Sequence, residues 1–395
     1  MRIGLLTYFW EDNPGEFFQA LASLQALRRV FPDSTVDIPD VRHWDQTGSG
    51  LSRRYWLTCP WRNLALRQRR RRYIQARNHD LSIAGPKTVT HDPVAAVREI
   101  QTRAYDLLVV GSDTTLYLWG DDRVQADLPP LYWLADLPKT PRVALSSCSH
   151  TNRYDKLNPV QREIMTRALK AFSFLAVRDP LTARLLESLG PPNGVPVRIS
   201  PDPTFSYNVD PAPAQAAMAR RRMGRNKPVC GLTLPYFTPF TKELARLLAG
   251  HFEIADLTGH YKGCTPVLEI GPYEWSGIFS QFDLHVTTSF HESIFCLKQG
   301  VPVFTVEAVP FRFDTESGKS KAYFLHEEFG LLESNYFNPH VNQQTPEEVC
   351  RMILERWESF DSQSAVKHAR ELGQRYMDIV LQMRRTVAGS LGLRD

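Results

Sequence analysis

A single histidine stands where a buried strand gives way to a helix in the segment Gln281–Thr305. Leu284 and Val286 predict the strand, and helical spacing of apolar residues predicts a helix that Gly300 ends. In an open parallel sheet, ligands bind beyond the carboxyl ends of the strands, where the N-termini of the following helices also point. His291 is therefore a candidate proton donor near neutral pH, with a capping or packing role as the alternative.

The residues flanking this histidine complete the candidate site. Ser289 and Phe290 precede it, at a position where a nucleotide, phosphate or sugar is commonly held. Glu292 follows it. A helix N-terminus disfavours a charged histidine, whereas a nearby carboxylate favours it. We expect Glu292 to help keep His291 protonated.

A carboxylate ends a second apolar strand, in the sequence Gly111-Ser112-Asp113 after Leu107–Val110. At a strand end, Asp113 could accept a proton from a substrate hydroxyl. It could equally be an N-cap or turn residue. Ser112 is a further candidate at the same strand end.

A third strand end carries Arg178, followed by Asp179 as the natural N-cap of a helix that starts at Pro180. The planar guanidinium fork suits a carboxylate or phosphate, so Arg178 is a candidate for binding an anionic donor. The alternative is that it pairs with a carboxylate of the protein and braces the domain.

The sequence Asn13-Pro14-Gly15 follows the first strand and precedes the first helix. Glycine there allows the backbone to turn tightly toward a ligand. Asn13 and Gly15 are therefore candidate donor-binding residues, with an ordinary strand–helix turn as the alternative.

The chain shows no metal-binding pattern. Its six cysteines include no CxxC and no zinc-finger spacing, and Cys148 with His150 supplies only two potential ligands. We expect catalysis without a metal or resident cofactor, and we expect buried thiols rather than disulfides.

Strand and helix patterns alternate along the chain, which predicts an α/β fold with parallel sheets. A stretch rich in proline, alanine and arginine interrupts this alternation between Asp210 and Pro228. We therefore expect two domains, residues 1–208 and 229–395, joined by a linker at 209–228. A long terminal helix over Gln363–Val387 is expected to reach back to the first domain.

Composition limits the classes of partner. The hydrophobic fraction is 43% and the formal net charge only +4, which favours a globular protein with no need of a nucleic-acid partner. The sequence shows no membrane-length apolar run and no secretory signal, so we expect a cytoplasmic protein. The basic run Arg67–Arg72 indicates a solvated face or loop, or else contact with an anionic membrane or lipid-linked substrate.

Six short motifs follow one another in an order that resembles the polysaccharide pyruvyl transferase family. The similarity spans about residues 1–335. The motifs are Asn13-Pro14-Gly15 with Phe17-Phe18-Gln19-Ala20, Gly111-Ser112-Asp113 with Trp119, Ala144–Ser149, Val177-Arg178-Asp179, Asp202-Pro203-Thr204-Phe205, and Thr288-Ser289-Phe290-His291 followed by Gly300–Pro302.

This resemblance implies two Rossmann-like domains facing across a cleft, similar to B-type glycosyltransferases. It also implies transfer of the enolpyruvyl group of phosphoenolpyruvate onto hydroxyls of a sugar or sugar-bearing metabolite. His291 would then be the acid, and Arg178 would bind the donor. The sequence departs from the family at Ser289, where some members carry arginine, and at Glu292, where glycine is usual.

Two other functions remain open on the sequence. One is a nucleotide-sugar glycosyltransferase on the same scaffold, with Glu307 as a ribose-binding acid. The other is a catalytically silent binding protein, which the absence of arginine at Ser289 favours and the retention of His291, Asp113 and Arg178 disfavours. The identity of the acceptor and the oligomeric state are not encoded in these patterns.

Overall fold

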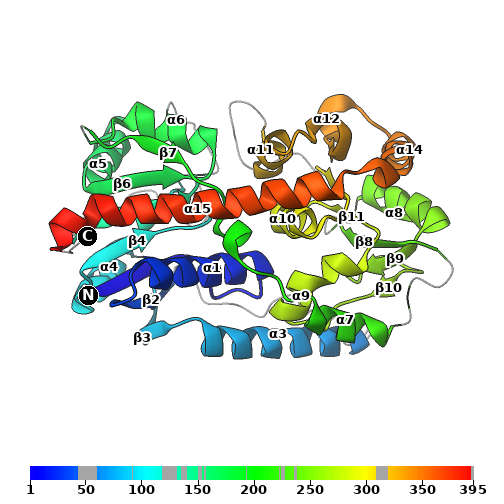
Figure 1. The fold of residues 1–395 in the computed structure, drawn as a ribbon, viewed down its shortest axis with the longest axis horizontal. Helices are drawn as coiled ribbons and strands as arrows, with labels where there is room; N and C mark the ends of the chain where they lie inside the picture. The colour runs from blue at the N-terminus through cyan, green and yellow to red at the C-terminus, as the bar shows by residue number, and fades with distance from the viewer. Residues whose placement is uncertain are drawn as a thin grey trace.

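The chain forms two parallel sheets, one in each half, and helices cover them (Figure 1). Each sheet reverses its strand order beside its first strand, as in a Rossmann-like domain, and such a reversal opens a crevice at the carboxyl ends of the strands. The computed structural model describes residues 1–42, 60–90, 92–117, 131–134, 140–149, 154, 157–192, 194–221, 223, 227–234, 238–307 and 319–392.

The first sheet has the order β3-β2-β1-β4-β5-β6-β7. Its strands are β1 (Arg2–Leu6), β2 (Thr35–Arg42), β3 (Ile83–Val89), β4 (Leu107–Val110), β5 (Arg142–Ser147), β6 (Phe172–Val177) and β7 (Val197–Ile199). The helices are α1 (Pro14–Val30), α3 (Pro60–Asp80), α4 (Pro93–Thr102), α5 (Pro159–Leu169) and α6 (Pro180–Leu189).

The second sheet has the order β10-β9-β8-β11-β12-β13. Its strands are β8 (Val229–Thr233), β9 (Glu253–Asp256), β10 (Thr265–Pro266), β11 (Leu284–Thr287), β12 (Val303–Val306) and β13 (Tyr336–Phe337). The helices are α8 (Pro239–His251), α9 (Pro272–Ile278), α10 (Phe290–Gln299), α11 (Lys321–Glu328), α12 (Leu332–Asn335), α13 (Pro339–Asn342) and α14 (Pro346–Arg356).

Local sequence signals account for many element ends. Asp179 caps α6 by accepting a hydrogen bond from the Thr182 N–H, and Gly300 ends α10 in the left-handed region with φ 71°. The expectation for Arg67–Arg72 was incomplete, because this run lies in helix α3. Arginines interrupt the apolar periodicity there, so pattern reading gave no helix.

Two segments tie the halves together. Helix α7 (Ala212–Ala219) forms within 209–228 and packs on α9, where Gly277 lies against the backbone of Asp210. Helix α15 (Ser362–Leu391) runs along both halves (Figure 1). In the first half, Tyr376 of α15 donates a 3.5 Å hydrogen bond to Ser23 of α1. None of the described helices has the length and apolarity to cross a membrane.

A half-buried lysine joins the second sheet's α10 to the chain that leaves the first sheet. Lys298 donates to the carbonyl oxygens of Thr204 and Tyr207. Burial lowers the pKa of its ammonium to about 7, although Asp202 acts in the opposite direction. An unfolded lysine titrates near 10.4, so between about pH 7 and pH 10 the unfolded chain binds more protons than the folded one.

We therefore predict that stability rises with pH across this window relative to a Lys298→Met variant. The cost of burying the ammonium is present in full below about pH 7, falls as the pH rises above that value, and is gone near pH 10, where the unfolded lysine also deprotonates. Urea unfolding of both proteins at several pH values between about 7 and 10 measures the difference. Parallel pH profiles for the two proteins would show that Lys298 does not carry the effect.

Candidate active site

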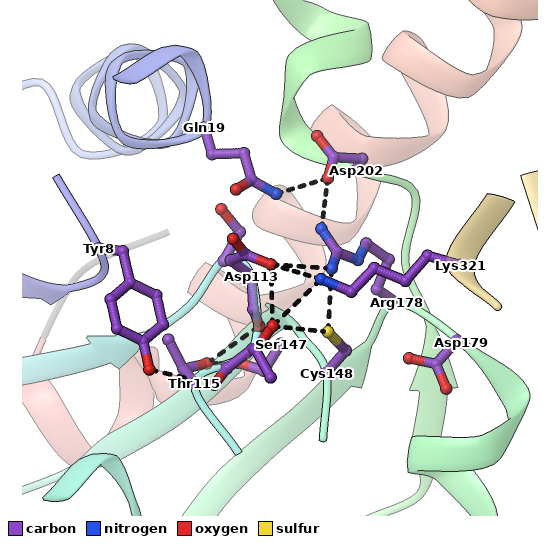
Figure 2. Close-up of polar contacts among 12 residues, drawn as sticks. Tyr8, Gln19, Asp113, Thr115, Ser147, Cys148, Arg178, Asp179, Asp202 and Lys321 are labelled. Carbon is purple, nitrogen blue, oxygen red and sulfur yellow. Dashed lines mark hydrogen bonds and ion pairs between the residues drawn. The ribbon is translucent and has the colours of Figure 1, made fainter. Parts of the chain in front are cut away.

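A charged cluster of Asp113, Arg178, Asp202 and Lys321 lies where the carboxyl ends of the first sheet face the second half (Figure 2). Arg178 follows β6, and its guanidinium is buried. One nitrogen lies 2.8 Å from the Asp202 carboxylate and another 3.1 Å from that of Asp113. The same side chain lies over the ring of Phe290, 4.9 Å from its centre. Arg178 therefore holds two carboxylates of the protein, which is the bracing alternative.

Asp113 is held in an unusual backbone conformation after β4, with φ 70°. The preceding Gly111 has φ 137°, and a Cβ there would lie 1.9 Å from the carbonyl oxygen of Leu145, so only glycine fits. This turn aims the carboxylate at Lys321 Nζ, 2.8 Å away, on helix α11 of the second half. Asp113 and Lys321 thus join the two sheets directly.

The charges around Asp113 bear on its chemistry. Burial alone would raise the pKa of this carboxyl, but Lys321, Arg178 and His291 hold it well below its usual range. A carboxylate with so low a pKa is a weak base. The geometry therefore favours an anchoring role over the proton-accepting role that the sequence suggested for Asp113.

Asp202 is the second carboxylate of the cluster and lies in the D-P-T-F motif. It accepts hydrogen bonds from Gln19 of α1 at 2.6 Å, from the Thr204 hydroxyl at 2.6 Å, and from Arg178. Burial would raise the pKa of Asp202, but His291 and Arg178 lower it strongly. Its carboxylate lies 3.8 Å from His291 Nε2. Among the described residues, Asp202 is the acidic residue that forms an ion pair with His291.

His291 occupies the first turn of α10 and faces the other half of the chain. A Cβ on Gly15 would lie 2.0 Å from His291 Nδ1, so glycine at the start of α1 makes room for the ring. Nε2 is buried and has no hydrogen-bond partner among the described residues. A buried ring nitrogen without such a partner is available to a substrate.

Two cavities lie close to this histidine. The first, of about 340 Å³, lies between the start of α1, helix α3 and the carboxyl ends of the second sheet. His291 lines it, together with Asp12, Asn13, Gly15, Arg62, Arg69, Thr258, His260, Ser289 and Glu292. The second, of about 370 Å³, is lined by Asp202, Arg178 and Lys321 of the cluster and by apolar residues that include Phe205, Phe290 and Phe324. His291 lines the first cavity and Asp202 lines the second, and the two side chains are 3.8 Å apart.

The sequence profile for polysaccharide pyruvyl transferase matches residues 13–307. The chain belongs to the polysaccharide pyruvyl transferase family. Family and fold together make it a transferase. No match was found among curated proteins.

Several solved structures are similar to this chain and show its fold. HepE of Anabaena, in complex with UDP and glucose, aligns with TM-score 0.54 and 11% identity, covering 99% of this chain and 100% of that one. UDP-GlcNAc 2-epimerase of Neisseria meningitidis, bound to UDP-GlcNAc, aligns with TM-score 0.53 and 11% identity over 98% and 100%. Sucrose-phosphate synthase of Thermosynechococcus elongatus aligns with TM-score 0.52 and 12% identity over 99% of each chain. The arrangement of two Rossmann-like domains is that of B-type glycosyltransferases.

The structure corrects the expected role of Glu292. Its carboxylate lies 2.8 Å from His285 Nε2 and accepts a 2.7 Å hydrogen bond from the Thr287 hydroxyl, both on β11. Residues adjacent in a helix point in different directions, so Glu292 does not pair with His291. The carboxylate that does approach His291, Asp202, comes from the other half of this transferase.

The remaining predicted residues are distributed around the first cavity and the cluster. Asn13 caps α1 and lines the first cavity, and Ser289 lines it at the start of α10. The Ser112 hydroxyl is buried without a hydrogen-bond partner among the described residues. Glu307 bonds Ser320 and Tyr336 and lines neither cavity. His150 lies outside the described residues.

Lys321 is the site residue that sequence reasoning missed. It begins α11, whose N-cap Ser320 accepts a hydrogen bond from the Tyr323 N–H. A lysine in the first turn of an ordinary helix carries no distinguishing signal in one sequence. Among the described residues, no group of three or more histidine, cysteine or acidic side chains could hold a metal ion.

Proposed function

We propose that this protein transfers the enolpyruvyl group of phosphoenolpyruvate onto two hydroxyls of a sugar, without a metal ion. The observation that carries the proposal is the placement of His291. Its ring lines the first cavity, is backed by the Asp202 carboxylate, and has at Nε2 no hydrogen-bond partner among the described residues. Such a histidine suits a proton donor to a substrate held in that cavity.

The reaction needs one acid. His291 gives a proton to the methylene carbon of the donor, and the adjacent carbon becomes cationic. One acceptor hydroxyl forms a bond to that cationic carbon. The bond between the same carbon and the phosphate oxygen then breaks, and a second acceptor hydroxyl bonds to the carbon to close the ketal. The two hydroxyl protons balance the proton taken by carbon and the proton taken by the departing phosphate. The Asp202 carboxylate lies 3.8 Å from Nε2 of this histidine.

The second cavity is the proposed acceptor site. Its rings of Phe290 and Phe324 offer apolar surface to the face of a sugar, and the exposed carboxylates Glu327 and Glu328 can accept hydrogen bonds from hydroxyls. Because Asp202 lines this cavity and lies 3.8 Å from His291 of the first, an acceptor bound there would lie near the donor.

The proposal predicts phosphate release from phosphoenolpyruvate that depends on a sugar acceptor and persists in excess EDTA. Methyl glycosides of common hexoses serve as acceptor probes, with ketal formation followed by mass spectrometry. In the same assay, Phe324→Ala should raise the acceptor KM and leave the donor KM unchanged. If the protein releases UDP from a UDP-sugar and does not react with phosphoenolpyruvate, it is a glycosyltransferase instead. If EDTA abolishes the activity and one divalent ion restores it, the metal-free mechanism is refuted.

A further inference from the structure

Helix α3 passes beneath α1 and reaches the second half of the molecule (Figure 1). Near the start of the helix, Arg62 donates a 3.5 Å hydrogen bond to the carbonyl oxygen of Thr258, and past its middle Arg72 forms an ion pair with Glu274 of α9. Within the basic run, Arg67 and Arg71 are exposed, whereas Arg69, Arg70 and Arg72 are partly buried. The run is therefore not a uniform solvated face.

One face of this helix forms a wall of the first cavity. Arg62, Leu66 and Arg69 all line it, and their spacing of four and three residues places them on the same side of the helix. Ser289 and His291, at the start of α10, line the same cavity. The two arginines therefore share one cavity with the candidate proton donor.

The charges of this cavity favour an anion. Its acidic residues have partners in the protein, since Asp12 lies 4.0 Å from Arg70 and Glu292 pairs with His285. Among the described residues Arg69 forms no ion pair, and its guanidinium donates to the carbonyl oxygen of Asp12 at 3.4 Å. Burial, and to a smaller extent the charge of Arg62, lower the pKa of His260, which also lines the cavity.

We propose that Arg62 and Arg69 bind the carboxylate and phosphate groups of the donor. The inference rests on the proposed function for the identity of that donor. Arginine forks form paired, charge-assisted hydrogen bonds with both groups. Position 289, which also lines the cavity, carries serine and supplies no positive charge, so α3 provides arginine cations to this cavity from the other half of the chain.

The test measures binding of phosphoenolpyruvate and, separately, of inorganic phosphate by calorimetry. Arg62→Gln and Arg69→Gln should each raise the Kd about ten- to a hundredfold, the usual effect of losing one charge-assisted hydrogen bond. Arg71→Gln is the matched control, because Arg71 is exposed on the same helix and does not line the cavity. It should leave both affinities unchanged.

A second variant separates an anion-binding role from a structural one. Adding Ser289→Arg to Arg69→Gln should restore part of the lost affinity, because it returns a cation to the same cavity. Thermal unfolding of each variant shows whether the fold is kept.

Each outcome decides something. Wild-type affinity in both glutamine variants overturns the inference and leaves the proposed function standing. Binding of phosphate but not phosphoenolpyruvate, lost in the variants, overturns the proposed donor and leaves the anion-binding arginines. Binding of neither probe by the wild-type protein overturns both.

Discussion

Replacing His291 by asparagine is expected to lower turnover by about 10²–10⁴-fold, the usual contribution of a general acid. Asparagine keeps a polar side chain of smaller volume beside Gly15, so the contact between α1 and α10 is not overpacked. The effect should fall on kcat more than on donor binding, because the proton moves in the transition state. Steady-state phosphate release with a saturating sugar acceptor measures it.

Two controls accompany this variant. His251→Asn changes an exposed histidine at the end of α8 and should leave turnover unchanged. Circular dichroism and thermal unfolding of His291→Asn should match the wild-type protein. Near-normal turnover in a folded His291→Asn protein would reduce this histidine to a helix-start packing residue and remove the proposed mechanism.

Local patterns predicted the strand ends that carry Asp113, Arg178 and His291 because each is a short-range signal. An apolar run followed by a polar residue marks where a strand stops, and the carboxyl ends of parallel strands share one edge of a sheet. The family's order of motifs then placed the second sheet opposite the first. Nothing local, however, indicated which of these side chains would pair with one another.

The partner of His291 illustrates this limit. Sequence adjacency suggested Glu292, but neighbours along a helix diverge, and Glu292 turns back to His285 on β11. Asp202 reaches His291 only because the two sheets face each other. A contact between residues almost ninety positions apart depends on tertiary packing, which a single sequence does not encode in its periodicity.

Helix α3 is a second case in which the local sequence pattern did not predict the structure. Its arginines obscure the apolar spacing on which helix prediction relies, so the run suggested a solvated face or loop, or else contact with an anionic surface. In the structure, Arg72 pairs with Glu274 of the second half, and Arg69 lines the first cavity. Contact of the exposed Arg67 and Arg71 with a membrane or lipid-linked substrate stays a prediction.

The role of Arg178 changes most between sequence and structure. Its fork suited a donor anion, yet both ends of the guanidinium hold carboxylates of the protein, and the side chain is only 5% exposed. Removing one partner of a buried ion pair leaves the other charge without compensation, which costs more than the pair itself contributes. Arg178 is therefore expected to matter first for the stability of the fold around Asp113 and Asp202.

We predict that Arg178→Ala lowers the free energy of unfolding by about 3–5 kcal/mol at neutral pH. Asp113 and Asp202 have pKa values below their unfolded values, so their favourable contribution is present above about pH 4 and is lost as the pH falls through the folded values. Without the arginine these buried carboxylates take up protons more readily, and the deficit of the variant should shrink on acidification. Urea unfolding at about pH 7 and about pH 4.5 measures both effects.

Arg178→Lys separates bracing from donor binding. Lysine keeps the charge but cannot hold two carboxylates with one planar fork, so it should recover only part of the stability. If Arg178 braces the cluster, the donor Kd of the folded lysine variant should stay near that of the wild-type protein. The opposite result would be a lysine variant whose free energy of unfolding is unchanged and whose donor affinity is reduced tenfold or more. It would show that Arg178 binds the donor, because bracing by the fork would then contribute nothing measurable to the fold.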